Sequence, residues 1–211
     1  MIITYYGNLC VKAQIGDTSV AFNPPLRNDG RTPRFSSNVA LFSTKEKDQN
    51  FSNSAGNPND FFIADGPGEY EIGGIFIRGI GVEQVVDGIK KMNTVYSVLF
   101  DEINLCHLGA VNVSELKPEV MEALGSIDIL FVPITGEPLA TPSTASKLTT
   151  ALEPRIIIPL QATDKGISTD SLKLFLKEEG SEGITAIDKL TIKKKEIEGK
   201  EEEIIVLTPI S

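Results

Sequence analysis

Asp65-Gly66-Pro67-Gly68-Glu69-Tyr70-Glu71-Ile72-Gly73-Gly74 is the stretch of this sequence that says most about its fold. Glycines at this density mark tight turns and places where backbone segments approach closely, because glycine has no Cβ and adopts positive φ angles. On an extended segment Glu69 and Glu71 share one face, so they could act together as acid and base. With no nucleophile or metal beside them, we interpret them as hydrogen-bonding groups in a structural element.

Short strand-like runs separated by turn residues lie on both sides of this stretch. They cover residues 2–6, 11–15, 19–22, 39–43, 61–64, 75–80, 94–100 and 103–107. Their density predicts extended sheets in the first half of the chain.

Helices alternate with strands from residue 114 onward. The predicted helices cover 116–124, the segment from Thr141-Pro142 to Pro154, and the segment from Ser168 or Thr169 to Gly180. Residues 127–132 and 156–159 are predicted buried strands, and 190–194 and 204–208 flank Gly199 as a predicted hairpin. This order of elements favours two sheets packed face to face with helices outside.

Four segments give the chain a resemblance to a known family. They are Tyr5–Cys10, Asp65–Ile75, Leu105–Ala110 and Pro154–Gln161. In order and spacing they resemble the metallo-β-lactamase superfamily, specifically its small bacterial metal-dependent hydrolases, from Met1 to about Thr163. The resemblance implies an α/β fold, the four-layer αββα sandwich, and we expect one domain over residues 1–211.

The family's metal-ligand motifs are altered in this chain. The loop that reads Thr-His-x-His-x-Asp-His in the family begins here at Thr44 and places Lys45, Lys47, Gln49 and Asn50 at its ligand positions. The family's His-Leu-Gly-Asp reads His107-Leu108-Gly109-Ala110, and its final histidine is Gln161. The early Gly-His-Ser-Cys reads Gly7-Asn8-Leu9-Cys10. Of the ligand positions, only His107 keeps the residue that the family has.

These replacements oppose metal binding on chemical grounds. A catalytic zinc takes about three ligands with free lone pairs from His, Cys, Asp or Glu, and the altered motifs retain one imidazole. The ammonium groups of Lys45 and Lys47 have no acceptor and repel a cation. Without a bound cation, no water at this loop would have its pKa lowered to make a nucleophile. We therefore expect no cofactor and an erased metal site.

Two functions remain open from the sequence. The first is a non-catalytic binding, regulatory or scaffolding protein of this fold, with an anionic small molecule in the vacated cleft. The second is a metal-dependent hydrolase of an ester, lactone or phosphoester, with zinc or manganese held by His107 and Asp48, Glu69 or Glu71. The second interpretation depends on analogy of fold.

Individual residues also have two interpretations each. Lys45 and Lys47 could bind an anion in place of the metals, or they could form a solvent-exposed charged turn with Asp48. His107 could be a leftover ligand, or a half-buried residue at a strand end that bonds to backbone. Cys10 and Cys106 are interpreted as buried small hydrophobes rather than a disulfide or metal pair.

Composition excludes several classes of protein. A formal charge of −9 and a pI near 4.7 argue against a nucleic-acid partner, which would need clustered Lys and Arg. Lys193-Lys194-Lys195 is followed by glutamates, so we interpret it as a solvated hairpin. No signal peptide or membrane-spanning run is evident, so we expect a cytoplasmic protein without a membrane partner. The sequence leaves a homo-oligomer open.

Overall fold

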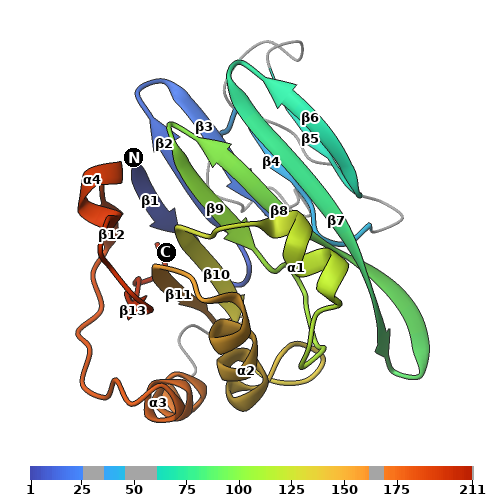
Figure 1. The fold of residues 1–211 in the computed structure, drawn as a ribbon, viewed down its shortest axis with the longest axis vertical. Coiled ribbons are helices and arrows are strands. Elements are labelled where there is room, and N and C mark those ends of the chain that lie inside the picture. Colours follow the sequence, from blue (N-terminus) through green and yellow to red (C-terminus); the bar gives the residue numbers. More distant parts are fainter. Residues whose placement is uncertain (26–35, 46–60, 162–168, 211) are drawn as a thin grey trace.

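The strands of the chain form two β-sheets (Figure 1). A computed structural model describes residues 1–25, 36–45, 61–161 and 169–210. Within these residues the first sheet has six strands, in the order β12 (Lys189–Thr191), β1 (Ile2–Tyr5), β2 (Val11–Ile15), β3 (Thr18–Phe22), β4 (Val39–Leu41) and β5 (Phe62–Ala64). The second has seven, in the order β13 (Glu203–Ile204), β11 (Ile156–Leu160), β10 (Ile129–Pro133), β9 (Ile103–His107), β8 (Ile89–Phe100), β7 (Ile75–Val86) and β6 (Gly68–Ile72).

The two sheets pack face to face around a shared hydrophobic core. Val20 and Leu41 of the first sheet belong to the same buried cluster as Val98 and Phe131 of the second. Alternate residues of each strand point into this core, because successive side chains of a strand face opposite ways. The other face of the second sheet is therefore free to bury a second layer.

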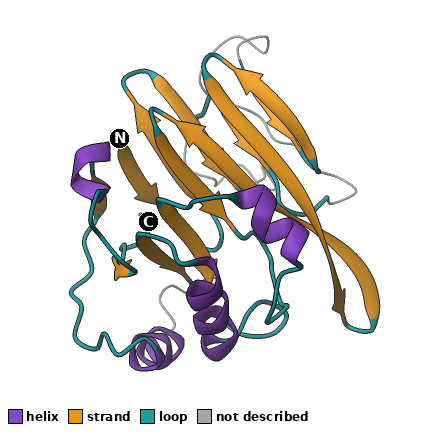
Figure 2. Ribbon diagram, in the orientation of Figure 1, coloured by secondary structure: helices purple, strands orange, loops and turns teal. Residues whose placement is uncertain are grey.

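Three helices form that layer, as Figure 2 shows. They are α1 (Pro118–Leu124), α2 (Pro142–Leu152) and α3 (Thr169–Glu178). Leu124, Leu148 and Phe175, one from each helix, are buried in one cluster with Leu130 and Ile157 of the sheet. The predicted sandwich of two sheets with helices outside is confirmed. None of the described helices has the length and apolar character needed to cross a membrane.

The start signal of one predicted helix, α2, corresponds to a real cap. The Thr141 hydroxyl accepts a hydrogen bond from the Thr144 backbone N–H at 3.1 Å, and Pro142 follows in the first turn of α2. Helix α1 begins at Pro118, two residues later than expected, after Lys117 in an extended conformation. Proline disfavours the helical conformation in the residue before it, which explains this later start.

The predicted C-terminal hairpin is wrong. Strand β12 pairs with β1 in the first sheet, whereas β13 pairs in parallel with β11 in the second. Between them lies the short helix α4 (Lys194–Ile197), in place of the solvated hairpin expected from the lysine run. Each closing segment pairs with a strand that is distant in sequence, and this is why local residue patterns suggested a hairpin instead.

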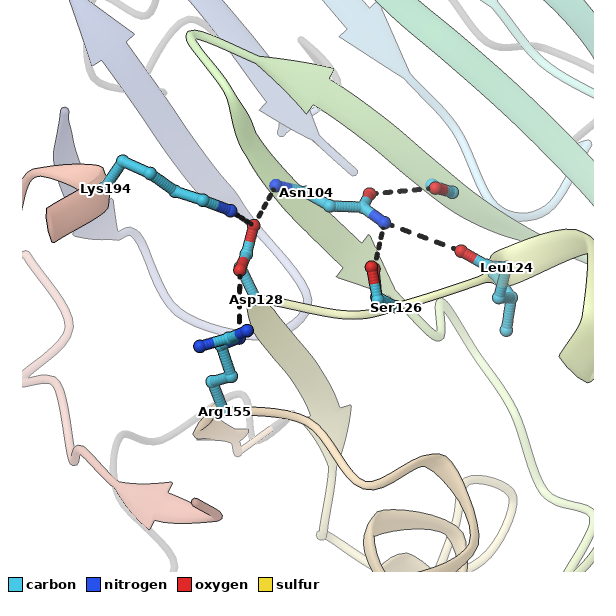
Figure 3. A network of polar contacts seen from close by, with 7 residues as sticks. Asn104, Leu124, Ser126, Asp128, Arg155 and Lys194 are labelled. Carbon is cyan, nitrogen blue, oxygen red and sulfur yellow. Dashed lines mark hydrogen bonds and ion pairs between the residues drawn. The ribbon is translucent and has the colours of Figure 1, made fainter. Parts of the chain in front are cut away.

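The lysine run is also less solvated than expected, because Lys194 bonds to a buried carboxylate. Its Nζ lies 2.6 Å from Oδ2 of Asp128, a residue with 5% relative exposure (Figure 3). The same oxygen accepts the Asn104 backbone N–H at 2.8 Å, and Arg155 lies 3.5 Å from Oδ1. Asp128 therefore joins α4 to the starts of β9, β10 and β11.

The hairpin formed by β7 and β8 is much longer than predicted. The expected strands 75–80 and 94–100 extend to Ile75–Val86 and Ile89–Phe100. Asp87 and Gly88 form the turn with φ angles of 54° and 74°, the positive values that two-residue hairpin turns of this kind need. Strand β6 pairs with β7 only as far as Gly79, and β9 pairs with β8 only from Tyr96. The remainder projects as a two-stranded ribbon.

The two cysteines behave as the sequence analysis predicted. Cys10 and Cys106 are both buried and both are free thiols. Burial raises the pKa of each thiol above its ordinary value, so each remains protonated. They pack as small hydrophobic residues and form no disulfide.

Candidate functional site

The strand ends that carry the altered ligand motifs meet at one end of the sandwich. His107 is the last residue of β9, and Gln161 directly follows the parallel strand β11. Lys45 follows β4, and the Thr94 N–H donates to the Ser43 carbonyl at 2.7 Å, which ties that segment to the second sheet. The structure therefore brings several of the predicted positions to one region. Three of them, Lys47, Gln49 and Asn50, lie outside the described residues, as does Asp48.

His107 is fully buried, so the expectation of a half-buried ring is wrong, although its expected bonds to backbone are confirmed. The Gly109 N–H donates to Nδ1 at 2.9 Å, and Nε2 lies 3.0 Å from the Leu9 carbonyl oxygen. A carbonyl can only accept, so Nε2 carries the hydrogen and the lone pair of Nδ1 is already engaged. The ring stacks on Phe22 with centroids 5.0 Å apart and planes inclined by 11°. Neither ring nitrogen offers a lone pair to a metal in this arrangement.

Burial also keeps this imidazole neutral. It lowers the pKa of His107 from 6.5 to about 4, and the hydrogen bond to the Leu9 carbonyl offsets part of that shift. The ring contacts Phe22 and Phe131, which cannot stabilise a positive charge by ionic pairing. His107 therefore serves as an uncharged structural group near neutral pH.

Two amide side chains fix the loop that follows His107. Asn93 Nδ2 donates to the Leu108 carbonyl at 2.9 Å, and its Oδ1 accepts the Ala110 N–H at 2.8 Å. Gln84 Nε2 donates to the Ala110 carbonyl at 2.7 Å, and its Oε1 accepts the Asn112 N–H at 3.1 Å. Both amides come from the β7–β8 ribbon and both are buried. The backbone at Ala110, where the family has a carboxylate, is held by uncharged groups.

Sequence reasoning missed Asn93 and Gln84, although a signal existed. Val82 and Val95, two positions away on the same strands and therefore on the same face, are buried. Polar residues at such core-facing positions need hydrogen-bond partners, because burying an amide without them costs free energy. A polar residue inside the core-facing pattern is the feature that would have drawn attention to them.

Gly109, in the loop that follows His107, packs directly against Ser43, just beyond the end of β4. Gly109 has a φ of 65°, and a Cβ built on it would lie 2.4 Å from Cβ of Ser43. Ser43 is itself fixed, because its N–H and its hydroxyl each lie 2.9 Å from Oδ1 of Asn23. Only glycine fits both the conformation and the close approach. The loop can neither shift toward Ser43 nor carry a side chain there.

Gln161 is buried beside Tyr5 at the end of β11. Its N–H donates to the Tyr5 hydroxyl at 2.9 Å, and that hydroxyl lies 2.8 Å and 2.9 Å from the carbonyl oxygens of Gln161 and Asn8. Burial raises the pKa of Tyr5, so its hydroxyl remains a donor. The side-chain Oε1 of Gln161 is buried without a hydrogen-bond partner in the part of the chain that the structure describes. An unmet acceptor of this kind is costly unless a water or ligand supplies a donor.

Lys45 is exposed, and its charge is paired. Its Nζ lies 3.0 Å from Oδ2 of Asp65, with 75% and 46% of the two side chains exposed. A pair this exposed contributes about 0–1 kcal/mol, so an incoming anion could compete for the ammonium group. The structure gives Lys45 a carboxylate partner and leaves its predicted anion site untested.

Glu69 and Glu71, two of the three carboxylates proposed for a remodelled metal site, do not approach His107. Glu69 and Glu71 share one face of β6, as predicted, and Glu69 pairs with Arg78 on β7 at 2.8 Å. Ile77 and Tyr96 point into the inter-sheet core, so Arg78 and the two glutamates lie on the opposite face. His107 pairs with Tyr96 and stacks on Phe22 inside that core. The sheet separates the imidazole from both carboxylates.

Among the residues that the structure describes, the donor set at this end of the sandwich does not fit a catalytic metal. Within the described residues, no group of three or more His, Cys, Asp or Glu side chains could hold an ion. The motif positions Lys47, Gln49 and Asn50 add no carboxylate, thiolate or imidazole by their residue types. We therefore derive no reaction step through a metal.

Comparison with known proteins assigns the family. A family model described as a beta-lactamase superfamily domain matches residues 2–161. The chain belongs to the metallo-β-lactamase superfamily. The resemblance drawn from the four sequence segments is thereby confirmed. No match was found among functionally curated proteins.

Solved structures extend the superfamily likeness over the whole chain. A candidate Zn-dependent hydrolase of the superfamily from Thermotoga maritima is 26% identical, with a TM-score of 0.73 over 98% of this chain and 97% of that chain. A candidate metal-dependent hydrolase from Parabacteroides distasonis is 16% identical, with a TM-score of 0.61 over 99% and 93% of the two chains. Igni18, a metallo hydrolase from Ignicoccus hospitalis, is 13% identical, with a TM-score of 0.61 over 100% and 96%. The last two show the fold alone.

Proposed function

We propose that this chain is a non-catalytic member of the metallo-β-lactamase superfamily, with a binding or regulatory role. The observation that carries the proposal is the state of His107, whose two ring nitrogens both bond to backbone groups. Recruiting this imidazole to a metal would break one of those bonds inside a fully buried site. A superfamily site also needs further lone-pair donors, and Ala110 and Gln161 supply neither an imidazole nor a carboxylate.

The ligand that we propose for the former metal centre is an anionic small molecule. Lys45 and Lys47 would provide positive charge where relatives have metal ligands. The exposed pair of Lys45 with Asp65 is weak enough to yield to a stronger anion. The unmet acceptor on Gln161 suggests that the same ligand also carries an N–H or O–H donor.

A remodelled metal-dependent hydrolase is the second candidate. Its support is the 26% identity to the Thermotoga maritima protein, described as a candidate Zn-dependent hydrolase. It would act on an ester, lactone or phosphoester with zinc or manganese. Because Glu69 and Glu71 lie across the sheet from His107, its ligands would have to include Asp48 and a rearranged His107.

Metal content separates the two candidates. We expect the purified protein to contain less than stoichiometric zinc or manganese by elemental analysis, and neither ion to raise its Tm. A stoichiometric ion, together with a rise in Tm, would refute the non-catalytic proposal. The positive control restores the family pattern in one variant: Lys45→His, Lys47→His, Gln49→Asp, Asn50→His, Ala110→Asp and Gln161→His. If the scaffold is intact, that variant gains metal and the parent does not.

Anion binding is tested separately. We expect inorganic phosphate to raise the Tm of the parent protein and to have no effect on a Lys45→Ala, Lys47→Ala variant of normal fold. A Lys173→Ala, Lys177→Ala variant, changed on exposed positions of α3, should respond as the parent does. Equal responses of all three proteins would refute the assignment of Lys45 and Lys47.

A further inference from the structure

A groove of about 770 Å³ lies on the outer face of the second sheet, away from the former metal centre. Asn104, near the start of β9, lines it, whereas His107 ends the same strand. One wall is the C-terminal end of α1, where Nη1 of Arg78 on β7 donates to the Ala123 carbonyl at 2.9 Å. The groove is therefore formed by the sheet together with a helix that is bonded to it.

The floor of the groove is a row of residues in register across four strands. Phe76 of β7 is opposite Glu71 of β6 and Leu99 of β8, and Leu99 is in turn opposite Asn104 of β9. The neighbours of each residue along its strand pack in the inter-sheet core, so the four side chains point outward. Phe76 and Leu99 form an apolar centre, with 49% and 43% of their surface exposed.

This apolar centre has the properties of a ligand site. Large apolar side chains that stay exposed side by side in a concave site are typical of a binding surface. The volume of the groove lies within the range of about 300–1,000 Å³ that is usual for sites of small organic molecules. Phe76 also offers an aromatic face, which attracts a cation placed over it.

The charge of the groove is negative. Five acidic side chains line it, against the two basic side chains Arg78 and Lys194. Arg78 pairs with Glu69, and Lys194 pairs with Asp128 (Figure 3). Three further carboxylates make no ion pair within the described residues, namely those of Glu71, Glu102 and Glu122.

These three carboxylates approach the apolar centre from different elements. Glu71 lies on the edge strand β6, Glu102 lies in the turn between β8 and β9, and Glu122 lies on α1. An anionic ligand would meet repulsion from all of them. A second copy of the chain, with a formal charge of −9, is a poor partner for the same reason. The charge and the floor together favour an occupant that is both cationic and apolar.

We propose that the groove binds a small organic cation with an apolar body, of the arylalkylamine class, at a site separate from the former metal centre. The apolar body packs on Phe76 and Leu99 and removes their exposed surface from water. The ammonium group lies among the carboxylates of Glu71, Glu102 and Glu122. Both parts of the ligand are needed, because each matches a different part of the groove.

Matched ligands test the proposal on the wild-type protein. Phenethylamine has an aromatic body and an ammonium group, hydrocinnamate has the same body with a carboxylate, and ethylamine lacks the ring. In an NMR titration of the backbone amides up to about 10 mM ligand, phenethylamine should bind with a Kd on the order of 1 mM. The shift changes should centre on Phe76, Leu99 and Gly125. Hydrocinnamate and ethylamine should bind about fivefold more weakly or less.

Substitutions test the residues of the groove. The Glu71→Gln, Glu122→Gln variant should bind phenethylamine about fivefold more weakly, because two carboxylates beside the apolar centre become neutral. Leu99→Ser should weaken binding by a similar factor, because it removes apolar contact. The control variant Glu115→Gln, Glu182→Gln, changed on exposed positions outside the groove, should bind as the wild type does. Circular dichroism should confirm that all variants keep the fold.

Three results would overturn the proposal. The first is no binding of phenethylamine to the wild type over the titrated range. The second is equal binding of phenethylamine and hydrocinnamate, and the third is an unchanged affinity in the Glu71→Gln, Glu122→Gln variant.

Discussion

The buried neutral histidine predicts a specific loss of stability in mild acid. The pKa of His107 is lowered from 6.5 to about 4 in the folded protein, because burial disfavours the charged ring. Between these values the unfolded chain binds a proton and the folded chain does not, so the free energy of unfolding falls as the pH falls. The contribution of the neutral His107 ring to the free energy of unfolding is fully present above pH 6.5. It is lost progressively as the pH falls to about 4.

The size of this effect follows from the same two pKa values. One pKa unit corresponds to about 1.4 kcal/mol, so the full loss below pH 4 is about 3 kcal/mol. Between about pH 7.5 and pH 5.0 the expected loss is about 2 kcal/mol. His107 is the only histidine in the chain, so no other imidazole contributes.

Urea unfolding at the two pH values measures the effect, with a His107→Gln variant as control. Glutamine can donate to the Leu9 carbonyl and accept from the Gly109 N–H, but it cannot titrate. The variant should be less stable than the wild type at pH 7.5, because it loses the stacking on Phe22, and the difference should shrink by about 2 kcal/mol at pH 5.0. Other titrating groups are common to both proteins and cancel. If the free energy of unfolding falls by the same amount in both proteins between the two pH values, the assignment of His107 as a neutral buried group is wrong.

Three further substitutions test the contacts described above, each by the free energy of unfolding in urea with a folded-state spectrum as control. Asp128→Asn should lose about 1–3 kcal/mol, because it removes the charge that pairs with Lys194, and unchanged stability would contradict that role. Asn93→Ala should lose about 2–4 kcal/mol, because two loop hydrogen bonds disappear and one buried N–H is left unmet. Gly109→Ala should lose about 2 kcal/mol or more, because its methyl group would collide with Ser43, and a neutral result would mean that the loop can move.

The sequence was sufficient for most of the strands and for the start of α2. Strand β9 has the predicted bounds, and Thr141 caps α2 as its hydroxyl and the following proline suggested. Such features are local, because they depend on alternation, capping and turn chemistry within a few residues. Strand β6, residues 68–72 within the glycine-rich stretch, was not predicted.

Two errors in the strand predictions have different causes. The ribbon of β7 and β8 was cut short because Lys90, Lys91 and Asn93 interrupt the apolar alternation. The Asp87-Gly88 turn was the available signal for its full length. The closing strands were wrongly paired with each other, since their true partners β1 and β11 are distant in the chain.

The positions of the altered motifs could be located from the sequence, but the bonding around them could not. The motif positions identified His107, Ala110 and Gln161, yet the groups that complete the site come from the ribbon. The burial of His107 depends on Phe22 from the other sheet, which no local pattern reveals. The same limit explains why Asn93 was not recognised.

The loop and the strand end at this end of the sandwich are held by uncharged amide side chains. A carboxamide offers both a donor and an acceptor, so one uncharged side chain can hold two backbone groups. Asn93 and Gln84 each do so around Ala110, and Asn23 uses its oxygen to hold Ser43 on the facing strand. Clustered carboxylates and imidazoles in the same place would need a cation to offset their repulsion and desolvation, whereas amides need none. Neutral hydrogen bonds therefore fix the loop at Ala110 and the facing strand end at Ser43.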